Sequence, residues 1–375
     1  MTSPRLPQVK AVPGRFHDSD MTFGQFLEEA WSVVCRSLGI GQRAVENVLA
    51  ELREVIRPWG SRPVGTRCDP PSFVSADGFP AEISISWKAG RPEVRILFES
   101  LSSDRTPFGS QEAGRELTRR LAHSAGVDVS RYLSIEDLFV TPVPERYRPT
   151  VWHSLAWRPG EKPHYKVYLN PQAHGREHVH DVVAEAMHRL DLATAWTPVG
   201  SRDKELARQG HELEFFALDL DGGNASRVKV YFRHHPMPMG ELDTVAALAH
   251  RHEPVRAARA RAVIYGRDSG IVGNEPMTCL AFRGGVTGPD EANVYLRLPD
   301  NTRTDAEAAA RIARLMRFEG ITPRPHAEVL RQLTASLPAN TGSLLELCSY
   351  RTTSAKLPAD IGLYLRFPLY AAATG

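Results

Sequence analysis

The sequence predicts a mixed α/β (α+β) fold in which one closed antiparallel β-barrel is surrounded by an outer ring of helices. From about residue 82 onward, alternating apolar and polar runs occur in pairs joined by short turns, with helical segments between the pairs. This unit recurs five times, with a period of about 60–70 residues. An open ten-stranded sheet would leave its edges exposed and one face poorly covered, so the sheet is expected to close.

The N-terminal part is expected to contain an arm and two helices. Residues 1–20 are rich in proline and polar side chains and are expected to be a flexible arm. Apolar residues then recur at helical spacing, which predicts helices over about 22–37 and 41–57. Residues 21–375 are expected to form one domain, because all five units contribute to a single core.

Ten strands are expected, in five antiparallel pairs. The pairs are EISISWK with EVRILFES, TVWHSLAW with YKVYLNP, LEFFALDL with RVKVYFR, MTCLAFR with NVYLRLP, and LLELCSYR with IGLYLRF. Turns rich in Gly, Pro or Asp, such as KAGRP and DGGNAS, join the two members of each pair, which indicates hairpins. Helices between the hairpins are expected at about 111–123, 177–190, 240–250 and 304–318.

Composition limits the partners and the location. Lys and Arg total 46 against 44 Asp and Glu, so the formal charge of +2 gives no reason to expect nucleic acid as a partner. The four cysteines are far apart, with no C-x-x-C pair, and are expected to be reduced in a cytoplasmic protein. No signal peptide and no run of about 20 apolar residues is present, so no membrane partner is expected. The chain is expected to be a monomer or a homodimer.

The second strands of the hairpins carry an unusual polar face. Residues two apart on a strand share a face, and the following residues lie on the polar one: Arg95, Leu97 and Glu99; Lys166 and Tyr168; Arg227, Lys229 and Tyr231; Asn293 and Tyr295; Tyr364 and Arg366. The opposite face is mostly apolar and suits contact with the outer helices. The cationic and aromatic face is therefore expected to line a central chamber.

Such a chamber suits an anionic ligand that generates a carbocation. Lys and Arg donors neutralise the oxygens of a diphosphate, and they stabilise the charge that develops when it leaves. Tyrosine faces attract an allylic cation, and they exclude water that would quench it. A single K-x-Y strand could equally face solvent, but the pattern recurs in three successive hairpins with aligned phase.

These residues resemble the dimethylallyltryptophan synthase family of indole prenyltransferases, whose fold is the ABBA barrel of five αββα repeats. The resemblance runs from about residue 22 to near the end of the chain, and a composition rich in Ala and Arg suggests a bacterial member. It implies that Lys166, Arg227 and Lys229 bind diphosphate and that Tyr168 and Tyr231 shield the cation.

The resemblance implies further site residues near the C-terminus. Asn293-x-Tyr295 stands where the family has Gln-x-Tyr, which implies a diphosphate contact and another shield tyrosine. Arg351 and Tyr364 resemble the family's last arginine and last shield tyrosine, and Arg366 competes with Arg351 for the diphosphate role.

The resemblance also bears on the acceptor, a further arginine and the base. Glu99 resembles the family's glutamate that receives the indole N–H, and Arg105 resembles the diphosphate-binding arginine that follows that glutamate, although it could equally be an ordinary loop residue. The family's lysine base on the third strand has no plain counterpart in TVWHSLAWRPG, where His153 and Arg158 are the nearby candidates. His153 could accept a proton near neutral pH.

The expected reaction is the transfer of a dimethylallyl or longer isoprenyl group from its diphosphate to an indole, in secondary metabolism. The expected acceptor is tryptophan or a small metabolite derived from it. Alternatives are another aromatic acceptor, such as a carbazole, phenol or naphthalene, and a non-catalytic barrel that binds a phosphorylated ligand. No D-D-x-x-D stretch is present, so no cofactor is expected and magnesium is expected to be dispensable.

Overall fold

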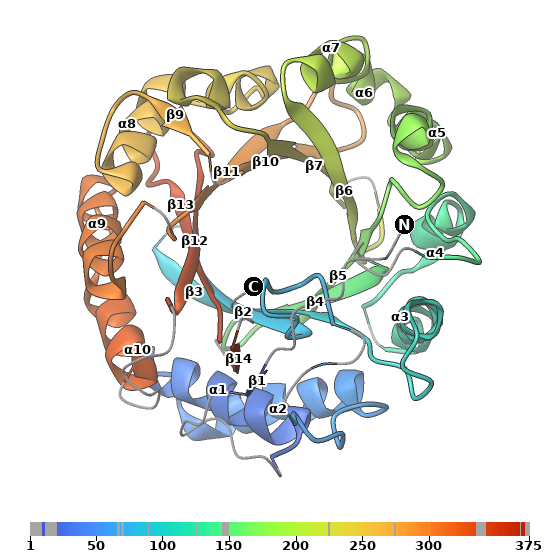
Figure 1. Cartoon of the computed structure of the whole chain (residues 1–375), viewed down its shortest axis with the longest axis vertical. Helices are drawn as coiled ribbons and strands as arrows, with labels where there is room; N and C mark the ends of the chain where they lie inside the picture. Colours follow the sequence, from blue (N-terminus) through green and yellow to red (C-terminus); the bar gives the residue numbers. More distant parts are fainter. Residues whose placement is uncertain are drawn as a thin grey trace.

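A closed barrel lies at the centre of the molecule, with helices around its outside (Figure 1). The computed structural model describes residues 10–11, 21–65, 68, 71–88, 90–124, 126–144, 150–223, 226–273, 275–299, 301–334, 343–367 and 369–371. Of the predicted arm over 1–20, this range includes only β1 (Lys10–Ala11), which pairs with β14 (Tyr370–Ala371). The rest of that prediction lies outside the described residues.

The barrel has ten strands in the described part of the chain, as predicted. They are β2 (Ala81–Lys88), β3 (Arg91–Glu99), β4 (Val151–Trp157), β5 (His164–Leu169), β6 (His211–Asp219), β7 (Val228–His234), β10 (Met277–Phe282), β11 (Glu291–Arg297), β12 (Leu345–Arg351) and β13 (Asp360–Leu365). Every neighbouring pair is antiparallel, and β13 pairs with β2 to close the ring. A short pair, β8 (Met237–Pro238) with β9 (Ile271–Val272), lies outside the barrel.

The outer layer consists of helices that connect successive hairpins. The α-helices are α1 (Phe23–Ser37), α2 (Gln42–Ile56), α3 (Pro107–Leu121), α4 (Ser130–Leu133), α5 (Val179–Arg189), α6 (Ala193–Gly200), α7 (Asp203–Arg208), α8 (Pro254–Tyr265), α9 (Asp305–Phe318) and α10 (Arg324–Thr334). The 3₁₀ helices are η1 (Glu136–Leu138), η2 (Arg176–His178), η3 (Met239–Asp243) and η4 (Ala246–Leu248).

Most predicted helices are confirmed, and their ends follow from capping. Thr22 and Gln25 form a capping box that begins α1, and the Thr106 side chain accepts from the Gly109 N–H, which begins α3 earlier than predicted. The segment predicted to be helical over 240–250 forms two short 3₁₀ helices, η3 and η4, in place of one continuous helix. Asp243, the last residue of η3, bonds His252 and Arg261, which ties the segment to α8.

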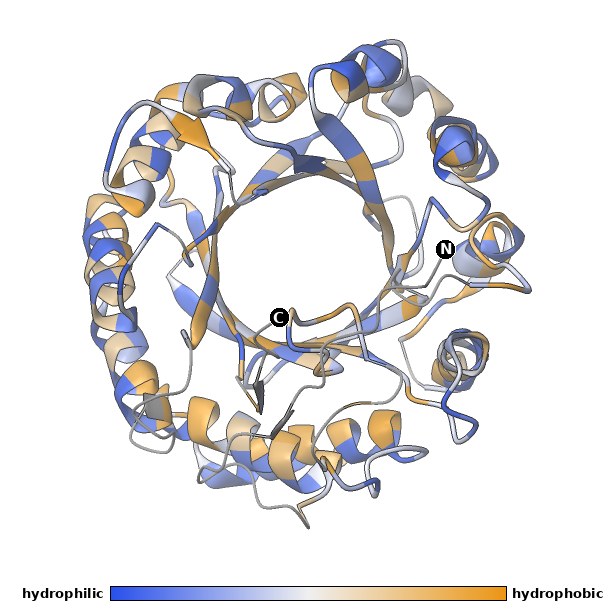
Figure 2. Cartoon of the chain, in the orientation of Figure 1, coloured by the Kyte–Doolittle hydropathy of each residue, from blue (hydrophilic) through white to orange (hydrophobic). Residues whose placement is uncertain are grey.

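The two faces of the barrel wall bury different side chains. Apolar residues of the outer face pack against the helices in one large core, and they include Val167, Val228, Val230, Val294, Leu296, Leu363 and Leu365. The inner face forms a separate cluster made of Trp152, Tyr168, Phe215, Ala217, Tyr231, Cys279, Tyr295, Leu347 and Tyr364. Apolar residues on the helices are concentrated on the side that faces the barrel (Figure 2). The predicted assignment of the two strand faces is therefore confirmed.

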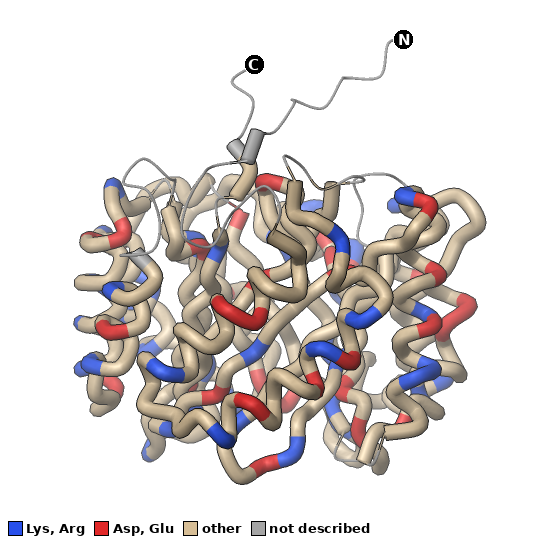
Figure 3. The backbone as a smooth tube through the Cα atoms, turned by 90° about the horizontal axis from the view of Figure 1, so that it is seen from below, with Lys and Arg blue, Asp and Glu red and all other residues tan. Residues whose placement is uncertain are grey.

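The outer surface carries both signs of charge. Acidic and basic residues are interspersed over the outer helices (Figure 3), consistent with the formal charge of +2.

Within the described ranges, no helix combines the length and the apolar character needed to cross a bilayer. The cysteines Cys35, Cys68, Cys279 and Cys348 are buried, and none of the four is part of a disulfide.

Gly114 sets how closely α3 packs on the barrel. A Cβ at this position would lie 2.7 Å from the Val151 carbonyl oxygen and 2.8 Å from the Val151 Cβ. Gly114→Ala should therefore destabilise the protein by about 1–3 kcal/mol through overpacking, measured as a lower urea midpoint. Gly240→Ala is the matched control, because a Cβ there meets no atom within 4 Å. Equal midpoints for the two variants would contradict the close packing.

Candidate active site

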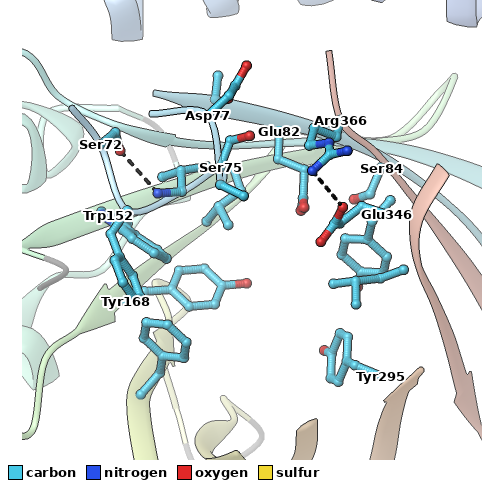
Figure 4. A pocket seen from close by; sticks show the side chains of 18 of the residues that line it. Ser72, Ser75, Asp77, Glu82, Ser84, Trp152, Tyr168, Tyr295, Glu346 and Arg366 are labelled. Atoms are coloured by element: carbon cyan, nitrogen blue, oxygen red, sulfur yellow. Dashed lines mark hydrogen bonds and ion pairs between the residues drawn. The ribbon is translucent and has the colours of Figure 1, made fainter. Parts of the chain in front are cut away.

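The barrel encloses a cavity of about 470 Å³. One end of its lining is formed by residues 71–78, which approach the barrel from the loop before β2. Figure 4 shows Glu82, Glu346 and Arg366 toward the end that carries Ser72, Ser75 and Asp77, with Tyr168 and Tyr295 further from that end. The chamber therefore has an aromatic part and a charged part that includes acidic groups.

Four tyrosines form a continuous arc on the inner wall. The ring centroids are 6.0 Å apart for Tyr168 and Tyr231, 5.9 Å for Tyr231 and Tyr295, and 5.6 Å for Tyr295 and Tyr364. Burial raises the pKa of each phenol, to about 12 for Tyr168. The phenols are neutral at physiological pH, and the structure brings all four predicted shield residues together.

A group of cations lies beside the tyrosine arc, toward the end of the barrel away from residues 71–78. Lys166, Lys229 and Asn293 each stand two residues from a tyrosine on the same strand face. Burial lowers the pKa of Lys166 and Lys229, and nearby Arg227 lowers both further. The predicted diphosphate residues on β5, β7 and β11 thus converge in one region.

Carboxylates that the sequence reasoning missed lie among these cations. Asp219 contacts Lys166 at 2.8 Å and Arg227 at 2.7 Å. On β11, Glu291 lies 2.7 Å from Arg351 and 3.9 Å from Arg227. The signal was present in the sequence, because Asp219 ends the strand that pairs with Lys166 and Glu291 shares a strand face with Asn293.

Arg351 and Arg366 lie at opposite ends of the barrel. Arg351 pairs with Asp360 at the start of β13, whereas Arg366 directly follows the end of that strand. Arg366 lines the cavity and faces Glu346 at 3.5 Å. The prediction that Arg366 binds diphosphate is therefore corrected, because β13 carries it away from the cation group.

Arg95, and not Arg105, adds a guanidinium to the chamber. Arg105 is exposed on the loop after β3, where its φ is 57°, so its predicted diphosphate role is corrected. Arg95 on β3 lines the cavity, with its side chain 11% exposed, and lies 3.2 Å from Glu93. The sequence placed Arg95 on the polar strand face but did not assign it to the site.

Glu99 is buried, but its oxygens are already engaged. Oε2 accepts from the Ser72 hydroxyl at 2.5 Å, and Oε1 accepts from the Thr150 hydroxyl at 2.6 Å. Burial raises the pKa of this carboxyl, while the bonds from Ser72 and Thr150 oppose the rise. Glu99 thus anchors the loop that carries Ser72, and the prediction that it receives an indole N–H is not supported by this geometry.

Glu82 is a carboxyl group that lines the cavity, as Asp77 and Glu346 also do. It lines the pocket near Arg366 (Figure 4), and it has no hydrogen-bond or ion-pair partner in the described part of the chain. Burial and the nearby Glu346 raise its pKa to about 8. The alternation of E-I-S-I-S could have identified it, because Glu82, Ser84 and Ser86 share one strand face, but the sequence reasoning considered only the second strand of each hairpin.

His153 lies on the outer face of the barrel wall. Its Nε2 is 2.8 Å from the Thr118 hydroxyl of α3, and its ring stacks on Phe98. Burial lowers its pKa to about 3, so the ring is neutral at physiological pH. The predicted role as base is corrected, because Trp152 and Ser154 flank it on the strand and Trp152 faces the chamber. Arg158, the other candidate, lies 3.5 Å from Glu93.

Five hairpins closed into one barrel, with a tyrosine arc beside buried cations, define the class of ABBA-type aromatic prenyltransferases. The family model for tryptophan dimethylallyltransferase matches residues 42–263, more than half of the chain. The chain therefore belongs to the tryptophan dimethylallyltransferase family and is a prenyltransferase.

Solved structures support this assignment. A 6-dimethylallyl tryptophan synthase has a TM-score of 0.84 and 28% identity, covering 94% of this chain and 98% of that one. The 5-dimethylallyl tryptophan synthase from Streptomyces coelicolor, in complex with DMASPP and Trp, has a TM-score of 0.82 and 27% identity, covering 96% and 97%. The more distant AnaPT from Neosartorya fischeri, at 16% identity and a TM-score of 0.74, covers 92% and 93% and shares the fold.

The raised pKa of Glu82 gives stability a pH dependence. In the folded protein this carboxyl stays protonated up to about pH 8, whereas an unfolded glutamate ionises near its ordinary pKa of 4.5. Wild-type stability should therefore decline relative to Glu82→Gln as pH rises from 5 to 8, and the difference should level off above that. Urea unfolding at pH 5, 7 and 9 measures it. A difference that does not change with pH would contradict the assignment.

Proposed function

We propose that this chain transfers a dimethylallyl group from dimethylallyl diphosphate to the indole ring of tryptophan by electrophilic aromatic substitution. One observation carries the proposal: the four tyrosines of the arc and the buried cations lie next to one another on the same inner wall. The complexes of similar enzymes with DMASPP and Trp support this choice of donor and acceptor. A tryptophan-derived metabolite would fit the same chemistry.

The cation group binds and stabilises the leaving diphosphate. Lys166, Arg227 and Lys229 supply N–H donors from adjacent strands, and Arg351 and Arg95 supply guanidinium groups from other parts of the wall. Asn293 adds a side-chain amide, whose N–H group can donate to a phosphate oxygen. Donors fixed in a dry site stabilise the charge that develops as the C–O bond breaks.

Metal independence follows as a proposal from this arrangement. Fixed cations can neutralise a diphosphate as a bound magnesium ion would. Within the described ranges, no group of three or more His, Cys, Asp or Glu side chains is placed to hold a metal ion. The same positive charge would be supplied by the protein itself.

The tyrosine arc protects the allylic cation. Neutral phenol rings present electron-rich faces to a carbocation without offering it a phenolate nucleophile. Their mutual contacts leave little room for water near the cation, which would otherwise be hydrolysed to an alcohol.

The acceptor binds toward the end formed by residues 71–78. Trp152 and Phe215, with ring centroids 5.2 Å apart, provide an aromatic wall for the indole. Glu82 is suited to accept the indole N–H through its carbonyl oxygen, which orients the ring. Arg366 and Glu346 lie at this end and suit the charged groups of an amino acid.

Incubation of the purified protein with dimethylallyl diphosphate and tryptophan should give a singly prenylated product, detected by mass spectrometry. Initial rates with and without EDTA should agree, because the protein's own cations neutralise the leaving group. A panel of carbazole, phenol and naphthalene acceptors distinguishes another aromatic substrate. No product from tryptophan, with turnover of one of these, would overturn the acceptor assignment.

Two glutamate variants distinguish the acceptor residue. Glu82→Ala should lower kcat/KM for tryptophan by about 10–100-fold, as expected for loss of a positioned acceptor group, with the KM for the donor little changed. Glu99→Gln should instead reduce thermal stability, because Glu99 accepts from Ser72 and Thr150. Measurement of kcat/KM and melting temperature for both variants tests this. The reverse pattern would restore Glu99 as the acceptor residue.

A further inference from the structure

A buried carboxylate occupies the centre of the cation group. Asp219, which is 6% exposed, lies at the end of β6. Its Oδ1 is 2.8 Å from the Lys166 Nζ and its Oδ2 is 2.7 Å from the Arg227 Nε. Each carboxylate oxygen therefore contacts a different cation, and each of those cations belongs to the proposed diphosphate site.

The same arrangement recurs around the wall. Glu291 contacts Arg351 at 2.7 Å and approaches Arg227 at 3.9 Å. Glu93 contacts Lys88 at 2.6 Å and Arg95 at 3.2 Å. Asp219 and Glu93 are 6% exposed and Glu291 is 5% exposed, so solvent screens the pairs weakly. Without them, buried like charges would repel one another across this end of the barrel.

These carboxylates use the donors that a diphosphate would need. A phosphate oxygen accepts hydrogen bonds from the same ammonium and guanidinium groups as a carboxylate oxygen. Lys229 differs from its neighbours, since it has no ion-pair partner in the described part of the chain. A diphosphate could thus contact Lys229 directly, but it must share Lys166 and Arg227 with Asp219.

We propose that Asp219 is a positioning residue that serves as the internal counter-anion of the diphosphate site. It holds Lys166 and Arg227 in place before the donor binds. It also competes with diphosphate for both cations, which weakens the binding of the product and allows it to leave. This inference rests on the proposed function. In that function the cations supply the affinity for diphosphate, and Asp219 limits it.

The direction of the effect separates this role from a structural one. Asp219→Asn keeps the size of the side chain and removes its negative charge. If Asp219 competes with diphosphate, the variant should bind inorganic diphosphate at least about tenfold more tightly, given the energy of one buried charge at contact distance. If Asp219 only maintains the local structure, the variant should bind diphosphate more weakly.

The test compares wild type, Asp219→Asn and the control Asp221→Asn. Asp221 lies two residues further on, is 42% exposed on its side chain and faces His164 at 3.8 Å. The measurements are the inhibition constant of inorganic diphosphate, the KM for the donor, kcat, and the rise in melting temperature on adding diphosphate. We expect a lower inhibition constant, a lower donor KM, a lower kcat and a larger rise in melting temperature for Asp219→Asn, with Asp221→Asn like wild type.

An inhibition constant for Asp219→Asn that is equal to or higher than that of wild type would overturn the inference. Glu291→Gln is the second variant if Asp219→Asn does not fold, and it should shift the inhibition constant in the same direction through Arg351. A wild-type protein that neither binds diphosphate nor forms product would instead overturn the proposed function. The two failures are therefore distinguishable.

Discussion

Closure of the sheet inside a layer of helices is the constraint on which the rest of the structure depends. Once the strands form a ring, each residue of the wall faces either the helices or the chamber. The helices supply an apolar surface, so Val167, Val230 and Leu363 face outward into the large core. The hydrophobic core of this protein is therefore the space between barrel and helices, and the interior of the barrel is available for chemistry.

Inside the barrel, charge is arranged along the axis. Cations with buried carboxylates among them lie at one end, neutral tyrosines lie in the middle, and Glu82 lies near Arg366 at the other end. This order suits a reaction in which an anion leaves in one direction and a neutral nucleophile approaches from the other. The carbocation would then form between them, where the side chains are aromatic and carry no charge.

The loop over residues 71–78 connects the wall to the acceptor end. Ser72 donates to Glu99 on β3, and the ring of Phe73 lies 6.3 Å from Trp152 on β4. Glu99, which the sequence pattern suggested for substrate binding, therefore holds this loop in place. Glu82, one strand away, remains open to the cavity.

The sequence by itself determined the ten strands, their pairing, most helices and which strand face is inward, because these follow from local periodicity and short turns. It also identified Lys166, Arg227, Lys229 and the four tyrosines, since residues at one strand phase share one wall. The tertiary structure alone showed that the oxygens of Glu99 are engaged whereas Glu82 lines the cavity, and that Arg105 is exposed whereas Arg95 lines the cavity. It also placed His153 on the outer face of the wall and Arg366 at the end of the barrel away from Arg351. Those choices depend on which partners lie beside a side chain and at which end of a strand it stands, and neither is encoded in the residues next to it in sequence.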